Sequence, residues 1–140
     1  MSRERVVIDT NVLISAALVP GGTPARVVSH VLEHQRLLFS EPTFEELRTR
    51  LFRPKFDRYL SLDDRNALLH DFNAAADWVD IAEVGRFSRD ADDDQFVQTA
   101  LNGGARWLVS GDADLLDLGS VQTVRIVSPA QALVDFQVPG

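Results

Sequence analysis

The stretch Val6-Val7-Ile8-Asp9-Thr10-Asn11-Val12-Leu13-Ile14 decides the fold of this 140-residue chain. An apolar, β-branched run ends at the carboxylate of Asp9, and a second apolar run follows at once with helical spacing through Leu18. This pattern predicts a buried parallel strand over residues 5–9 that leads into a helix over residues 11–18. A strand buried on both faces accommodates a charge at its carboxyl end, where a parallel sheet opens into a crevice. We therefore expect Asp9 to lie at a functional site.

Strand and helix patterns alternate along the rest of the chain. Further strands are predicted over residues 37–40, 78–82, 106–110 and 124–127, with amphipathic helices between them. There is no internal repeat, low-complexity segment or linker, so we expect one domain over residues 1–140. The alternation predicts an α/β fold, a three-layer α/β/α sandwich around a mainly parallel sheet of about five strands.

The composition limits the kinds of site that the chain can build. It contains no cysteine, so a bound metal would be held by oxygen or imidazole ligands. No apolar run approaches membrane-spanning length, and the first five residues lead straight into the first strand, which predicts a cytoplasmic protein without a secretory signal. The formal charge of −7 argues against attraction of the whole surface to nucleic acid, although bound cations would cancel part of it locally.

Acidic residues from separate segments are expected to meet at one edge of the sheet. Asp9 ends the first strand and Asp112 follows the fourth, while Glu46 and Asp93 lie in helices that flank the strands. Two carboxylates about 4 Å apart repel by roughly 4 kcal/mol at an effective dielectric constant near 20. A cation would relieve this repulsion, and hard oxygen ligands favour Mg²⁺ or Mn²⁺. Such an ion orients a phosphate and lowers the pKa of water, which predicts phosphodiester hydrolysis.

Four motifs, in order along the chain, resemble those of the PIN-domain ribonucleases. Residues 6–13 are similar to the family's first motif, 40–56 to its second, 90–94 with the helix that follows to its third, and 107–116 to its fourth. The run Arg53-Pro54-Lys55-Phe56 and the ending Gly111-Asp112-Ala113-Asp114-Leu115-Leu116 resemble in particular a bacterial subgroup described as toxins of toxin–antitoxin pairs.

The resemblance implies an endoribonuclease that uses one or two Mg²⁺ or Mn²⁺ ions to cut single-stranded RNA, with in-line attack by water and a 5′-phosphate product. The family's catalytic, metal-binding acids correspond to Asp9, Glu46, Asp93 and Asp112. Its polar supporting positions correspond to Asn11 and Ser110, where serine replaces the commoner threonine. A small antitoxin partner and a homodimer are further implications of the same likeness.

Several assignments have competing interpretations. Glu46 is preferred to Glu45 because it neighbours the apolar side of its helix through Leu47. Acids at a helix start are favoured by the helix dipole alone, so the third motif has a purely structural reading as well. Asp94 and Asp114 are expected auxiliary ligands, with Asp114 also able to cap a helical turn. A basic stretch is expected either to guide RNA or to be a solvated helix face, and comprises Arg48, Arg50, Arg53, Lys55 and Arg58.

Other functions share an acidic pocket on a parallel sheet. A phospho-acceptor receiver domain needs a lysine after a late strand, but the only lysine, Lys55, lies in the first half of the chain. A haloacid-dehalogenase-like phosphohydrolase with Asp9 as nucleophile needs a second aspartate two residues later, where this chain has Asn11. A binding protein built on the ribonuclease scaffold is a third alternative, and the complete set of four acids disfavours it.

Overall fold

The computed structural model describes residues 3–140, so the first two residues of the predicted domain lie outside the description. The strands are β1 (Arg5–Ile8), β2 (Arg36–Phe39), β3 (Asp77–Trp78), β4 (Trp107–Val109), β5 (Ser120–Val121) and β6 (Val124–Val127). The helices are α1 (Thr10–Leu18), α2 (Thr23–His34), α3 (Glu41–Leu51), α4 (Leu62–Ala75), α5 (Ala91–Gly103), α6 (Ala113–Leu118) and α7 (Pro129–Asp135), with a short 3-10 turn, η1 (Pro54–Phe56).

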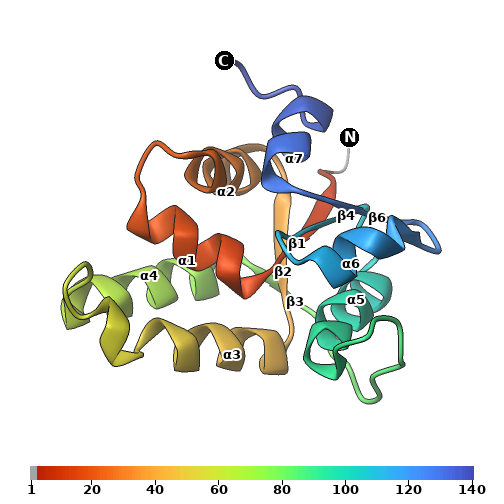
Figure 1. Cartoon of the computed structure of the whole chain (residues 1–140), viewed down its shortest axis with the longest axis horizontal. Helices are drawn as coiled ribbons and strands as arrows, with labels where there is room; N and C mark the ends of the chain where they lie inside the picture. Colours follow the sequence, from red (N-terminus) through yellow and green to blue (C-terminus); the bar gives the residue numbers. More distant parts are fainter. Residues whose placement is uncertain (1–2) are drawn as a thin grey trace.

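The strands form one sheet in the order β3-β2-β1-β4-β6-β5, with β1 near its middle (Figure 1). All neighbours are parallel except β5 and β6, which are antiparallel. The chain continues from β1 to β2 on one side, and returns later to place β4 on the other side of β1. The strand order therefore changes direction between β1 and β4, which is where open α/β sheets form their ligand crevice.

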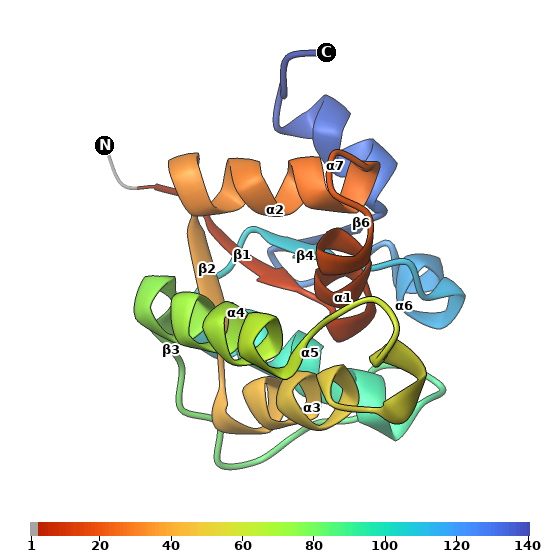
Figure 2. The ribbon, with the colours of Figure 1, turned by 90° about the vertical axis from the view of Figure 1, so that its left-hand side faces the viewer.

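Helices cover both faces of the sheet, as Figures 1 and 2 show, so the predicted three-layer α/β/α fold is confirmed. Alternate residues of the strands face opposite layers. One apolar core joins Val6, Ile8 and Phe39 to α1, α2, α3, α4 and α7. The other joins Val7 and Leu108 to α5 and α6. Strands covered on both faces explain why their sequences are continuous apolar runs.

The structure corrects two predicted elements. The third strand was expected over residues 78–82, but β3 spans only Asp77–Trp78, and residues 79–90 have no regular secondary structure. The next backbone N–H, that of Val79, still donates to the carbonyl of Phe39, and β2 offers no residue beyond Phe39 to continue the pairing. The two-residue strand β5 was not expected, and it extends the sheet beyond the predicted five strands.

No single helix within residues 3–140 is long and apolar enough to cross a bilayer. The pair α1 and α2 has sufficient combined length and apolar composition, but its two helices are bent by 107° relative to each other.

Candidate active site

Asp9 and Asp112 are joined through Ser110 at the carboxyl ends of β1 and β4. Ile8 pairs with Val109, so Asp9 and Ser110 are the next residues of adjacent strands. The Ser110 hydroxyl donates to Oδ2 of Asp9 at 2.7 Å, and its Oγ accepts from the backbone N–H of Asp112 at 3.0 Å. Burial raises the pKa of Asp9, a residue that is only 3% exposed, while the hydrogen bond from Ser110 opposes that rise.

Glu46 reaches the same region from α3. Its Oε2 accepts from the Thr10 hydroxyl at 2.6 Å, and its Oε1 lies 2.8 Å from a guanidinium nitrogen of Arg50. Burial raises the pKa of Glu46, and the negative charge of Asp9 contributes in the same direction. Glu45 instead pairs with Arg48 in solvent. The structure thus brings Glu46, and not Glu45, to Asp9.

Asp93 is the acid on which the other charges converge. Burial and, after it, the negative charges of Asp112, Asp9, Asp90 and Glu46 together raise its pKa to about 7. Its Oδ2 is buried and has no hydrogen-bond partner among the described residues. A buried carboxylate oxygen without a partner is costly unless it is protonated or binds a cation. We call Asp9, Glu46, Asp93 and Asp112 the acid cluster.

The raised pKa of Asp93 predicts a pH dependence of stability. Between the ordinary carboxyl pKa and about 7, folded Asp93 holds a proton that the unfolded chain has lost, so stability falls as pH rises through this window. We expect the melting temperature in EDTA to be higher at pH 5 than at pH 8. His30, whose pKa is lowered by burial, acts in the opposite direction, so the contribution of Asp93 is the difference between the parent and Asp93→Asn. Equal pH profiles for the two proteins would contradict the prediction.

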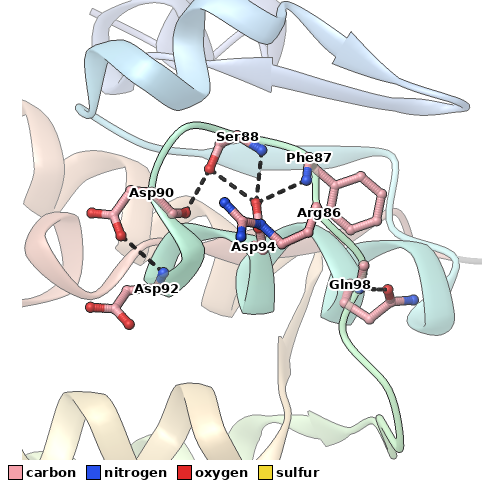
Figure 3. Close-up of polar contacts among 8 residues, drawn as sticks. Arg86, Phe87, Ser88, Asp90, Asp92, Asp94 and Gln98 are labelled. Atoms are coloured by element: carbon pink, nitrogen blue, oxygen red, sulfur yellow. Dashed lines mark hydrogen bonds and ion pairs between the residues drawn. The ribbon is translucent and has the colours of Figure 1, made fainter.

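Asp94 lies outside the acid cluster, which corrects its expected role as an auxiliary ligand. Figure 3 shows it directed at the loop that precedes α5. Its Oδ1 accepts from the backbone N–H groups of Phe87 and Ser88 and from the Ser88 hydroxyl, and its Oδ2 pairs with Arg86 at 3.0 Å. These hydrogen bonds outweigh the effect of burial and lower the pKa of Asp94. Both oxygens are therefore engaged in holding the loop.

Asp94→Ala is expected to destabilise the protein by about 2–4 kcal/mol, because it leaves several N–H groups without their acceptor. Urea unfolding measures the loss, and hydrogen exchange should increase at Phe87 and Ser88. Asp92→Ala is the matched control. Asp92 lies two residues before Asp94, its side chain is exposed, and its hydrogen bond to Asp90 is made by its backbone N–H. Equal stability of the two variants would contradict the assigned role of Asp94.

The other predicted site residues, Asn11, Asp114 and the basic stretch, differ in how close they lie to the acid cluster. Asn11 is exposed and accepts from Arg50 at 3.4 Å, and Asp114 lies in the first turn of α6, where its backbone N–H donates to Asp112. Arg50 is half-buried and pairs with Glu46 of the acid cluster, so it does not belong to an exposed basic rim. The exposed residues of the basic stretch are Arg48, Arg53, Lys55 and Arg58.

Sequence reasoning identified Ser110 but missed two other hydroxyl contacts near the acids, those of Thr10 and Ser40. Thr10 was passed over between Asp9 and Asn11, although it bonds Glu46. Ser40, at the start of α3, lies 2.8 Å from Thr99 of α5 (oxygen to oxygen), and both side chains are fully buried. This contact ties the helix that carries Glu46 to the helix that carries Asp93. A serine before Glu41-Pro42 is a recognisable helix cap, but no local signal reveals a partner 59 residues away.

The donor set fits a divalent cation. The cluster offers carboxylate oxygens, the ligands that Mg²⁺ and Mn²⁺ prefer, and the unpartnered Oδ2 of Asp93 is one of them. Within residues 3–140, no three carboxylate or imidazole groups are already close enough to form a complete ligand set. The acids thus influence one another electrostatically without closing around a single point.

The chain is an α/β protein with acidic side chains at the topological switch point of its sheet, and its sequence identifies the family. Residues 5–114 match the model of the PIN domain, so the chain belongs to the PIN domain family. Uncharacterized protein MJ1680 of Methanocaldococcus jannaschii is 30% identical over 116 residues, which cover 81% of this chain and 74% of that protein. This relative is archaeal, so the match supports the family and not the bacterial subgroup.

Solved structures share the fold at low sequence identity. PAE2754 from Pyrobaculum aerophilum has a TM-score of 0.62 at 14% identity, with 97% of this chain and 91% of that chain covered. VapBC2 from Rickettsia felis, bound to a DNA fragment from its promoter, has a TM-score of 0.58 at 10% identity, with 89% and 98% covered. FitAcB from Neisseria gonorrhoeae has a TM-score of 0.50 at 20% identity, also with 89% and 98% covered.

Proposed function

We propose that this protein is a Mg²⁺- or Mn²⁺-dependent endoribonuclease that hydrolyses phosphodiester bonds of single-stranded RNA. The observation that carries the proposal is that four carboxylates, from the ends of β1 and β4 and from α3 and α5, act on one another, and one of them has a buried, unpartnered oxygen. Membership of the PIN domain family supports the same conclusion. The receiver-like and dehalogenase-like alternatives lack such support.

Three of the four acids have a separate means of orientation in this proposal. Ser110 fixes Asp9, and the backbone N–H groups of Asp114 and Leu115 bind Oδ1 of Asp112. Thr10 fixes Glu46, whereas Oδ2 of Asp93 stays available. A divalent cation held by these four acids, with Asp114 as an auxiliary ligand, would stabilise charge on the phosphate and lower the pKa of water. Oriented ligands reduce the reorganisation that the reaction requires.

We further propose a cytoplasmic location and the toxin role of a toxin–antitoxin pair, with a small antitoxin partner and a homodimeric state. Support comes from the motifs at residues 53–56 and 111–116 and from the fold shared with VapBC2 and FitAcB. The exposed Arg48, Arg53 and Lys55 are proposed contacts for RNA phosphates near α3 and η1.

The adjacent glutamates provide a direct test. We expect Glu46→Gln to reduce the rate of Mn²⁺-dependent cleavage of a single-stranded RNA by about 100-fold or more, because it removes an ionised oxygen ligand. Glu45→Gln is the matched control and should retain the parent rate, since Glu45 pairs only with Arg48 in solvent. Cleavage that is absent from the parent under all metal conditions, or equal loss in both variants, would contradict the proposal.

A further inference from the structure

Arg50 is a positively charged side chain held within the acid cluster. Its Nη2 lies 2.8 Å from Oε1 of Glu46, and its Nη1 donates to Oδ1 of Asn11 at 3.4 Å. Only 26% of its side chain and 14% of that of Glu46 are exposed. Its charge also acts on Asp9, whose pKa it helps to lower against the effect of burial. Arg50 therefore offsets part of the negative charge that the acids bring together.

Arg48 shows that this contact is not a general feature of the helix. It lies two residues before Arg50 and pairs with Glu45, but that pair is more than half exposed on both sides. Exposed pairs of this kind contribute little free energy because water and salt screen them. The two arginines are thus similar in chemistry and sequence position and differ in what they contact.

The pairing of Arg50 places it in competition with any cation that binds Glu46. Oε2 of Glu46 accepts from Thr10, so Oε1, the oxygen next to Arg50, is the one available for exchange. A divalent ion at that oxygen would either displace the guanidinium or lie beside a like charge, and both are unfavourable. A displaced guanidinium would remain near Asn11 at the edge of the cluster, with its planar donors free for an anionic group.

We propose that Arg50 is a resident cation that competes with the divalent ion for Glu46 and, once released, binds the phosphodiester of the substrate. This inference rests on the proposed function. It assigns to one side chain both a limit on metal affinity and a contact with the substrate that forms only after metal binding. The guanidinium of Arg50 would then be free to bind a phosphate of the substrate only when metal is present.

A metal titration tests the first half of the proposal without measuring activity. The melting temperature of the parent, Arg50→Met and Arg48→Met is followed against Mn²⁺ concentration, each relative to its own value in EDTA. We expect Arg50→Met to reach its half-maximal shift at about tenfold lower Mn²⁺, which corresponds to about 1.4 kcal/mol. Arg48→Met should follow the parent curve. Identical curves for the parent and Arg50→Met would overturn the competition while leaving the metal site itself intact.

A cleavage assay at saturating Mn²⁺ tests the second half. We expect Arg50→Met to cleave RNA at least about tenfold more slowly than the parent despite its tighter metal binding, with Arg50→Lys intermediate because it keeps the charge without the forked donors. A parent rate for Arg50→Met would overturn the phosphate contact. If Mn²⁺ shifts the melting temperature of none of the three proteins, the metal dependence proposed above fails, and the role of Arg50 fails with it.

Discussion

Asp9→Asn is expected to lower the rate of metal-dependent RNA cleavage by at least about a thousandfold, equivalent to about 4 kcal/mol in the activation barrier. Asp9 lies at the switch point between β1 and β4, and its carboxylate takes the hydrogen bond of the fully buried Ser110. Asparagine keeps an oxygen that can accept from Ser110 but removes the negative charge that a cation needs. Cleavage of a fluorescent single-stranded RNA in Mn²⁺ measures the effect.

The same variant should remain folded, which separates a chemical effect from a structural one. Burial raises the pKa of Asp9, so the ionised form is disfavoured in the folded state, and a neutral amide of the same shape avoids that cost. We expect the melting temperature of Asp9→Asn in EDTA at pH 8 to equal or exceed that of the parent. A folded variant with the parent rate would remove Asp9 from the mechanism.

Mg²⁺ or Mn²⁺ is expected to raise the melting temperature of the parent by about 5–10 °C. A ligand at 100 times its dissociation constant stabilises the folded state by about 2.7 kcal/mol, and each kcal/mol shifts the midpoint of a chain of this size by about 2–4 °C. The unfolded chain does not gather the four acids, so an ion at this site would bind the folded state selectively. Thermal unfolding in EDTA and in millimolar metal measures the shift.

Two controls distinguish site binding from a general salt effect. Potassium chloride at equal ionic strength should not reproduce the shift, because screening alone acts on all surface charges. Asp112→Asn should abolish most of it, since it removes one of the four carboxylates of the acid cluster, whose charge acts on Asp93 and Asp9. A shift of the same size in Asp112→Asn would place the bound ion elsewhere on the protein.

The residues at the carboxyl edge of the sheet could be predicted, because the apolar pattern of a strand is visible in the strand's own sequence. A continuous apolar run indicates a buried parallel strand, and the residues that follow such strands must share one edge. This reasoning predicts that Asp9 and Asp112 lie at one edge of the sheet, and the hydrogen bonds through Ser110 agree with it. The position of Glu46 beside the apolar side of its helix likewise favours Glu46 over Glu45 as the inward acid. In the structure Glu46 contacts Thr10, whereas Glu45 pairs with Arg48 in solvent.

The parts that escaped prediction depend on irregular backbone or on distant partners. Asp94 resembles its neighbours in sequence, and only the path of residues 86–88 reveals that it binds their backbone. The third strand ended early because its partner β2 ends at Phe39, a limit that β3's own residues do not encode. Arg50 could have been paired with Glu46 from their i, i+4 spacing, but the spacing does not say that Glu46 faces Asp9.

The layered arrangement has a consequence for how the protein tolerates mutation. Asp9 and Asp112 lie just after strands β1 and β4 of the sheet. Glu46 belongs to α3 on one face of the sheet, and Asp93 belongs to α5 on the opposite face. Larger side chains at Val97 or Ala100, which pack α5 against the sheet, would move Asp93 away from the other three while the chain stayed folded. Catalysis should thus be lost before stability along α5, so selection on activity would constrain this distant packing layer as strictly as the acids themselves.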